Sequence, residues 1–193
     1  KKIKENFNFK PSTPYAISRA ATDTHLKKSY DNFKFPIIFT RTANIYGPGQ
    51  QLYRIVPKTI ISGIQRKKIF LHGGGNSKRS FIYVKDASEA TLKICVKGKL
   101  GETYHISTNK IISIKSLVNL LCKLNHFKYK NLVSSSKDRV GKDKFYILDS
   151  TKIRRELGWK PKTTLEHGLE RTSEWIKKNI KILKKQKTHY IHK

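Results

Sequence analysis

Residues 35–50 read FPIIFTRTANIYGPGQ, and this stretch decides the fold of the chain. Its first part, residues 35–40, is a short and continuous apolar run, which is typical of a buried parallel strand. Residues 46–49 then read YGPG, which favours a turn or loop. Helix-like segments flank this stretch at 15–30 and 55–64, so the pattern predicts an α/β protein.

Strands and helices continue to alternate further along the chain. We expect strands at 68–71, 80–84, 103–107 and 145–148. Four later helices are expected to begin at residues that favour the N-cap position, namely Asp86, Ser113, Ser150 and Thr164. Gly158 stands where a left-handed residue ends the helix that Ser150 opens.

The composition limits the classes of function. The 193 residues carry 42 Lys+Arg against 13 Asp+Glu, a formal net charge of +29, which favours a polyanion partner. The cations are mostly Lys and are spread through the chain, so nucleic acid is not the expected partner. No segment approaches the ~18–20 apolar residues that span a bilayer, and the first residues do not resemble a signal peptide. Cys95 and Cys122 are expected to be buried thiols of a cytoplasmic protein.

Several common site motifs are absent from the sequence. The glycines at 73–75 lack the spacing of a phosphate-binding loop, and G-x-G-x-x-G does not occur, so we expect a tight connection between two strands. The seven histidines form no H-x-x-x-H pair, so no metal site is expected. No G-x-S-x-G elbow is present, which argues against an α/β-hydrolase.

Tyr15 and Arg19 form the first candidate pair for chemistry. They are four residues apart on a predicted helix, so they share one face. A cation one turn from a phenol favours the phenolate, which is how a tyrosine can serve as a base near neutral pH. The spacing alone is more typical of a packed tyrosine with a surface arginine, and both interpretations stay open at this point.

Five segments then follow one another in a characteristic order. They are PSTPYAISRAA at 11–21, RTANIYGPGQ at 41–50, RSFIYVKD at 79–86, GETYHI at 101–106 and ELGWKP at 156–161. In this order they resemble the Y-x-x-x-K, R-x-x-N-x-Y-G-P-x-Q, R-x-[FW]-[IL]-Y-V-x-D, G-E-x-Y-N-I and E-L-G-W-x-P segments of extended short-chain dehydrogenases/reductases that act on nucleotide sugars. DRVGKDKFYILD at 138–149 and RIVP at 54–57 are similar to segments of the dTDP-glucose 4,6-dehydratases within that family.

The resemblance implies an NAD-dependent lyase that converts dTDP-glucose to dTDP-4-keto-6-deoxyglucose. Tyr15 stands at the position of the catalytic base, which also lies against the cofactor. Arg19 stands where the family has the lysine that binds the nicotinamide ribose. An arginine keeps the charge but replaces a compact ammonium with a wide planar group.

Five further residues match positions that hold the nucleotide sugar in this family. They are Asn44, Arg54, Arg79, Arg139 and Tyr146. The guanidinium group suits this role because it can bind phosphate oxygens at two points. A UDP-sugar 4-epimerase or decarboxylase of the same family remains an alternative, and so does a non-catalytic basic binding module.

The resemblance covers only part of the family's fold. The Gly-rich βαβ unit that binds NAD and the T-[DS]-E motif precede the matched segments, so we expect the C-terminal portion of a longer enzyme with an incomplete Rossmann fold. We expect residues 1–65 to end the NAD-binding domain, 66–180 to bind the sugar nucleotide, and 181–193 to form a basic tail. The expected strand at 35–39 would then lack neighbours and expose an apolar edge. The intact protein is expected to be a homodimer.

Overall fold

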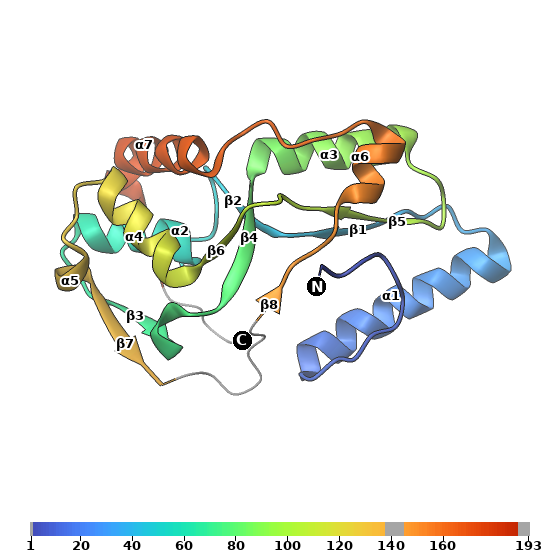
Figure 1. Cartoon of the computed structure of the whole chain (residues 1–193), viewed down its shortest axis with the longest axis horizontal. Helices are drawn as coiled ribbons and strands as arrows, with labels where there is room; N and C mark the ends of the chain where they lie inside the picture. Colours follow the sequence, from blue (N-terminus) through green and yellow to red (C-terminus); the bar gives the residue numbers. More distant parts are fainter. Residues whose placement is uncertain (1, 138–144, 189–193) are drawn as a thin grey trace.

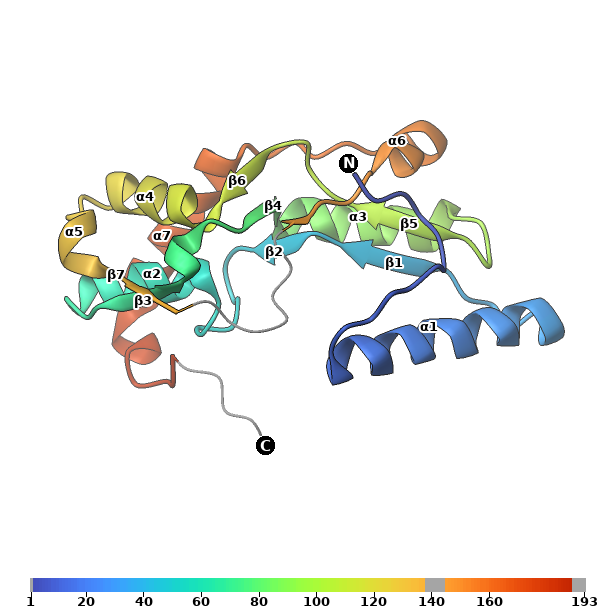
Figure 2. The same cartoon turned by 60° about the horizontal axis from the view of Figure 1, so that its bottom comes forward.

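The computed structural model describes residues 2–137 and 145–188, apart from the side chains of 145 and 146. The structure is an α/β fold with short, mainly parallel strand pairs (Figure 1). Helix α1 lies at one end, beside the β1–β5 pair, and helices α2, α4, α5 and α7 gather at the other end, as Figures 1 and 2 both show. The expected α/β class is therefore confirmed.

The helices account for most of the regular structure. They are α1 (Pro14–Phe33), α2 (Ile55–Ile64), α3 (Val84–Lys97), α4 (Ile114–Leu124), α5 (Tyr129–Leu132), α6 (Thr151–Leu157) and α7 (Leu165–Leu183). A single turn of 3-10 helix, η1 (Gly73–Gly75), connects β3 to β4, which confirms the expected tight connection.

The strands form three small groups. They are β1 (Phe39–Thr42), β2 (Asn44–Tyr46), β3 (Ile69–His72), β4 (Lys78–Tyr83), β5 (Thr103–Ile106), β6 (Ile111–Ser113), β7 (Val133–Ser136) and β8 (Phe145–Tyr146). β1 pairs in parallel with β5, and β3 pairs in parallel with β7. β4 is the central strand of the third group, because β2 and β8 pair with it in parallel and β6 pairs with it antiparallel.

The buried side chains form three apolar clusters. The first joins α2, α4 and α7 to β2 and β4, the second joins α3 and α6 to β5, and the third lies between β3 and α4. Ile60, Leu117 and Leu169 are fully buried in the first cluster, and Tyr104 and Ile153 in the second. The apolar stripes expected on the helices beginning near 113 and 164 are therefore core.

Tyr46, the last residue of β2, connects the end of this strand to helix α7. Its hydroxyl donates a hydrogen bond to the backbone oxygen of Leu165 at 3.1 Å, and its side chain is 1% exposed. Burial is the main reason why the pKa of this phenol lies far above its ordinary value, and the nearby Asp86 charge adds to the effect. Gly168 makes the contact possible, since a Cβ at that position would lie 2.2 Å from the Tyr46 hydroxyl oxygen.

The capping residues in the sequence correctly predict most helix boundaries. Ser113 and Thr164 cap α4 and α7, and their side chains accept hydrogen bonds from the N–H of Ser116 and His167. Gly158 ends α6 with φ 59°, as expected. Ser150 precedes α6 but does not cap it with its side chain. Its hydroxyl donates instead to the backbone oxygen of Ser107.

Three expectations were wrong in detail. The strand expected at 35–40 begins only at Phe39, because 35–38 belong to the connection from α1. Helix α3 begins at Val84, and the Asp86 carboxylate accepts hydrogen bonds from the backbone N–H of Lys162 and Thr163 rather than capping its own helix. Cys95 is exposed, whereas Cys122 is buried as expected. The segments β6, α5 and β7 were not expected at all.

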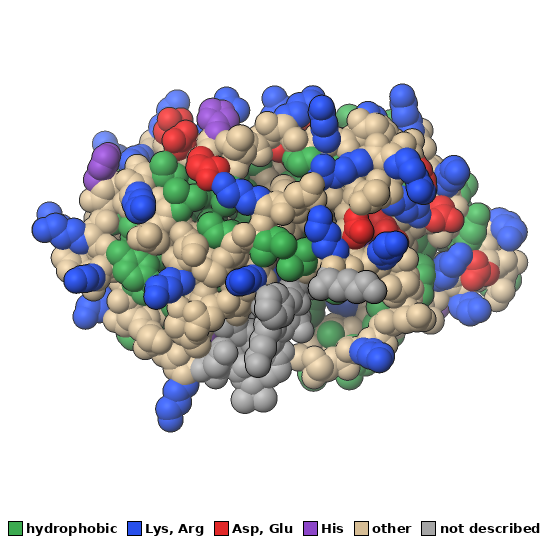
Figure 3. Space-filling view, in the orientation of Figure 1, with side chains coloured by type: hydrophobic (Ala, Val, Ile, Leu, Met, Phe, Trp, Pro, Cys, Tyr) green, Lys and Arg blue, Asp and Glu red, His purple; other side chains and the backbone are tan. Residues whose placement is uncertain are grey.

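The basic side chains are spread over the surface, as their distribution along the sequence indicates. In the view of Figure 3, Lys and Arg side chains are spread over the whole visible face and do not gather into one stripe. No helix in the described part of the chain is long and apolar enough to cross a membrane.

Candidate functional site

Strand β4 brings three of the expected substrate-binding residues together. Its Arg79 lies opposite Tyr146 of β8, and its Phe81 lies opposite Asn44 of β2. Since side chains alternate along a strand, Arg79 and Asn44 belong to the same face of this group. The Asn44 amide donates to the backbone oxygen of Ser80 at 3.3 Å, which fixes its position beside β4. Arg139, the fourth expected residue, lies outside the described residues.

Arg54 stands at the start of helix α2. It occupies the N-cap position, and no side chain caps the helix there. Its guanidinium group lies 5.2 Å from the centre of the Tyr53 ring. The N-terminus of a helix carries a partial positive charge and unpaired N–H groups, and the first turn of α2 has no acidic residue to neutralise them. This end of α2 is therefore suited to an anion such as a diphosphate.

Tyr15 and Arg19 lie in the first half of α1, away from β4 (Figure 2). Thr13 caps this helix by accepting a hydrogen bond from the N–H of Ala16 at 3.2 Å, and Pro14 occupies the first turn. None of the 20 residues of α1 is buried, and Tyr15 is 76% exposed. The structure thus confirms the helix that carries this pair but does not bring the pair to Arg79 and Asn44.

The aromatic residues of the N-terminal segment hold Arg41 in place on β1. The Arg41 guanidinium lies 5.2 Å and 4.8 Å from the ring centres of Phe7 and Phe9. It also pairs with Asp23 of α1 at 3.0 Å and donates to the backbone oxygen of Asn6 at 2.7 Å. Arg41 therefore links the N-terminal segment, α1 and β1, and so helps to orient the helix that carries Tyr15. Spacing alone did not reveal this link, because its partners are far apart in the sequence.

His105 is buried on β5 beneath the same N-terminal segment. Its exposure is 0%, and neither ring nitrogen has a hydrogen-bond partner among the described residues. The Glu5 carboxylate accepts a hydrogen bond from the backbone N–H of His105 and lies 3.9 Å from the ring nitrogen Nδ1. Burial lowers the pKa of His105 below its ordinary value, and the negative charge of Glu5 opposes this effect only in part.

We expect the stability of the chain to fall in mild acid because of His105. Between the unfolded pKa near 6.5 and the lower pKa of the folded state, the unfolded chain binds more proton at this residue than the folded chain does. In that window the free energy of unfolding therefore decreases as the pH is lowered, by at most about 1.4 kcal/mol per pH unit. His105→Asn, which restores the asparagine of the family's G-E-x-Y-N-I segment, should flatten this slope in urea unfolding between pH 5 and 7.5. The exposed His25 of α1 offers a matched control, since His25→Asn should leave the slope unchanged. An equal slope in wild type and His105→Asn would contradict the prediction.

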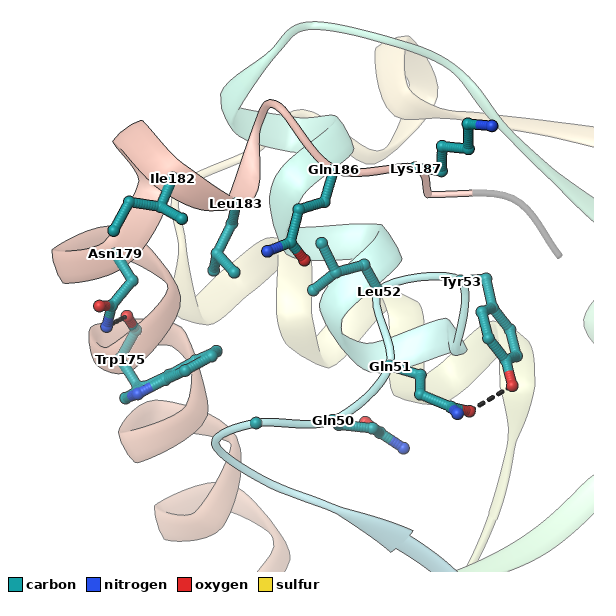
Figure 4. A pocket seen from close by; sticks show the side chains of 11 residues that line it. Gln50, Gln51, Leu52, Tyr53, Trp175, Asn179, Ile182, Leu183, Gln186 and Lys187 are labelled. Atoms are coloured by element: carbon teal, nitrogen blue, oxygen red, sulfur yellow. Dashed lines mark hydrogen bonds between the residues drawn. The ribbon is translucent and has the colours of Figure 1, made fainter. Parts of the chain in front are cut away.

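The described part of the chain has hollows at two places outside these contacts. One, of about 490 Å³, is bordered by Lys78 of β4, Ser113, Ser116 and Ile147. The other, of about 560 Å³, lies between the loop at 49–53 and α7 (Figure 4). Among the described residues, no group of three His, Cys, Asp or Glu side chains is placed to hold a metal ion.

Comparisons with known proteins identify the family. The family model described as GDP-mannose 4,6 dehydratase matches residues 1–172. The dTDP-D-glucose 4,6-dehydratase of Mus musculus is 37% identical over 175 residues, which are 88% of this chain and 49% of that protein. The chain therefore belongs to this nucleotide-sugar dehydratase family, as its five ordered segments indicated.

Solved structures agree with this assignment. The dTDP-glucose 4,6-dehydratase of Bacillus anthracis, in complex with NAD, matches with a TM-score of 0.91 and 30% identity over 97% of this chain and 59% of that one. The UDP-glucose 4-epimerase of Thermotoga maritima, with UDP-glucose, matches with a TM-score of 0.82 and 28% identity over 89% of this chain and 55% of that one. The incomplete extended short-chain dehydrogenase fold is confirmed, and the chain spans about half the length of the curated relatives it matches.

Proposed function

We propose that this chain is the substrate-binding part of an NAD-dependent dTDP-glucose 4,6-dehydratase. The observation that carries the proposal is the alignment of Asn44, Arg79 and Tyr146 on three paired strands, with Arg54 at the uncapped start of α2. Two arginines and a helix N-terminus supply the positive charge that a nucleotide diphosphate requires. Arg139, which lies outside the described residues, would add a third guanidinium group.

The residues present here fit only one part of an NAD site. Tyr15 and Arg19 lie on an exposed helix face, where they are accessible to a nicotinamide ribose. The sequence has no G-x-G-x-x-G segment to bind the pyrophosphate, so that part of the site must come from outside these 193 residues. NAD, when bound, supplies the hydride acceptor for the oxidation of the sugar.

The chain's own residues then have separate roles in the proposed reaction. Tyr15 removes the proton of the sugar's C4 hydroxyl, and Arg19, one turn later on the same helix face, would hold the nicotinamide ribose. Arg54, Arg79, Arg139, Asn44 and Tyr146 bind and orient the nucleotide sugar, which places the C4 hydroxyl in reach of the base. The acid and base of the dehydration step belong to the T-[DS]-E motif, which this sequence does not contain.

The organisation of the intact protein is part of the same proposal. We assign 1–65 to the end of the NAD-binding domain, 66–180 to the sugar-nucleotide-binding domain and 181–193 to a basic tail. The exposed apolar residues of α1, among them Ile17 and Phe33, suit a helix that is covered in the complete homodimer. The free thiols of Cys95 and Cys122 suit a cytoplasmic protein.

Product analysis tests the proposed reaction. The intact gene product should convert dTDP-glucose into a product that has a C4 ketone and a C6 methyl group, which proton NMR detects directly. A product that keeps its C6 hydroxyl and differs only in the configuration at C4 would instead establish the epimerase alternative, for which the match to the T. maritima enzyme is the favouring observation.

A further inference from the structure

The extended segment at 39–46 changes its neighbouring strand halfway along. Its first part, β1, pairs with β5 as far as Thr42, and its second part, β2, pairs with β4 from Asn44 onward (Figures 1 and 2). Asn44, one of the candidate substrate-binding residues, therefore stands where the neighbour changes. The contacts around this point decide how its amide is held.

A pair of buried hydroxyl groups joins β4 to the end of β5 at this point. The Oγ atoms of Ser80 and Ser107 lie 2.9 Å apart, and the two residues are 1% and 0% exposed. The pairing of β4 with β2 begins at Phe81, so Ser80 lies just before it. The backbone oxygen of Ser80 accepts the 3.3 Å hydrogen bond from the Asn44 amide. Ser80 thus contacts Ser107 through its hydroxyl group and Asn44 through its carbonyl group.

Helix α6 holds Ser107 from the other side. The Ser150 hydroxyl and the Arg154 nitrogen Nη2 both donate to the backbone oxygen of Ser107, at 3.0 Å and 3.4 Å. The Arg154 nitrogen Nε also donates to the Ser150 hydroxyl at 3.3 Å. Buried polar groups are stable only when they are hydrogen-bonded, and a network of them fixes one arrangement of the backbone. This network extends from α6 to the Asn44 amide.

The orientation of the Asn44 amide matters for a ligand. An asparagine amide carries two N–H donors and one acceptor oxygen, and the bond to Ser80 uses one of the donors. The side chain is only half-buried, so its oxygen and its second N–H are left for a bound molecule. A binding group gains most when its orientation is fixed before the ligand arrives.

We propose that Ser107 is a positioning residue of the nucleotide-sugar site. It holds Ser80, and through Ser80 it holds the Asn44 amide, in the orientation that the ligand requires. The inference rests on the proposed function, because it takes Asn44 to be a ligand of the nucleotide sugar.

Isothermal titration of the 193-residue chain with dTDP-glucose tests this role. Ser107→Ala should weaken binding about threefold to tenfold, as expected for the loss of one hydrogen bond. It should also lower the midpoint of urea unfolding, because the Ser80 hydroxyl stays buried without its partner. The double variant Ser80→Ala/Ser107→Ala removes both hydroxyl groups, so its stability should return toward that of wild type while its binding stays weak.

Two controls separate positioning from a purely structural role. Ser173→Ala removes a buried hydroxyl group of α7, so it should lower the stability and leave the affinity unchanged. In an Asn44→Ala background, Ser107→Ala should change the affinity by less than about twofold, since the residue acts through Asn44. Additive effects of these two substitutions, or a double serine variant that regains its affinity together with its stability, would overturn the proposal.

NMR of the same chain, labelled with nitrogen-15, observes the Asn44 amide without a ligand. Its side-chain N–H resonances should shift in Ser80→Ala/Ser107→Ala and stay in place in Ser173→Ala. If the wild-type chain binds dTDP-glucose but the double serine variant shows unchanged resonances and affinity, this inference alone is wrong. If the wild-type chain does not bind dTDP-glucose, the proposed function fails and this inference fails with it.

Discussion

Tyr15→Phe is expected to lower the turnover of the intact enzyme by about a hundredfold to ten-thousandfold. The change removes only the phenolic oxygen, which accepts the proton of the sugar's C4 hydroxyl, and general-base catalysis contributes an effect of this size. The side chain is 76% exposed, so its loss should not disturb the core. The measurement is the initial rate of 4-keto product formation at saturating dTDP-glucose, together with the melting temperature.

Tyr30→Phe provides the matched control for this substitution. Tyr30 lies on the same helix, four turns beyond Tyr15, and the same single oxygen is removed. Turnover of this variant should stay within about twofold of wild type, since the residue is remote from the proposed reaction. A Tyr15→Phe enzyme that keeps most of its turnover would show that another group takes the proton.

Gly168→Ala is expected to destabilise the chain by about 2–4 kcal/mol. Replacing a helical glycine with alanine normally stabilises a protein by about 0.5–1 kcal/mol, so the predicted sign is reversed. The new Cβ would lie 2.2 Å from the Tyr46 hydroxyl oxygen in a fully packed region, and it would break the hydrogen bond to Leu165. The midpoint of urea unfolding measures the change.

A double-mutant cycle with Tyr46→Phe isolates this contact. Tyr46→Phe removes the oxygen nearest to the new Cβ, so the cost of Gly168→Ala should be smaller in that background. Additive effects of the two substitutions, or stabilisation by Gly168→Ala alone, would show that the packing of β2 against α7 is looser than the structure indicates.

The sequence predicted best those features that depend on neighbouring residues. Ser113, Thr164 and Gly158 were correctly placed because helix caps are formed by contacts within one turn. Asp86 was misassigned because its partners, the N–H groups of Lys162 and Thr163, are more than seventy residues away. The late start of β1 has a similar cause, since the strand extends only where β5 lies beside it.

The arrangement of the candidate site could likewise be predicted from the sequence only in part, because it depends on contacts between distant residues. Resemblance singled out Asn44, Arg79 and Tyr146, but only the pairing of β2 and β8 with β4 places them together. The Arg41 link to Asp23 and the burial of His105 under the N-terminal segment depend on packing between distant parts of the chain, which no local pattern reveals. The roles of Tyr15 and Arg19 stay predictions, because their exposed helix lies apart from β4.

Isothermal titration of the 193-residue chain shows whether this chain retains a nucleotide-sugar site. At one fixed salt concentration, dTDP should bind more tightly than UDP or CDP, and Arg54→Ala and Arg79→Ala should each weaken dTDP binding about tenfold or more, as expected for a charged hydrogen bond. NAD should not bind at micromolar concentration, since the pyrophosphate-binding segment is absent from this sequence. Equal affinities for all three nucleotides that fall steeply with salt would instead describe a general polyanion surface and contradict the account.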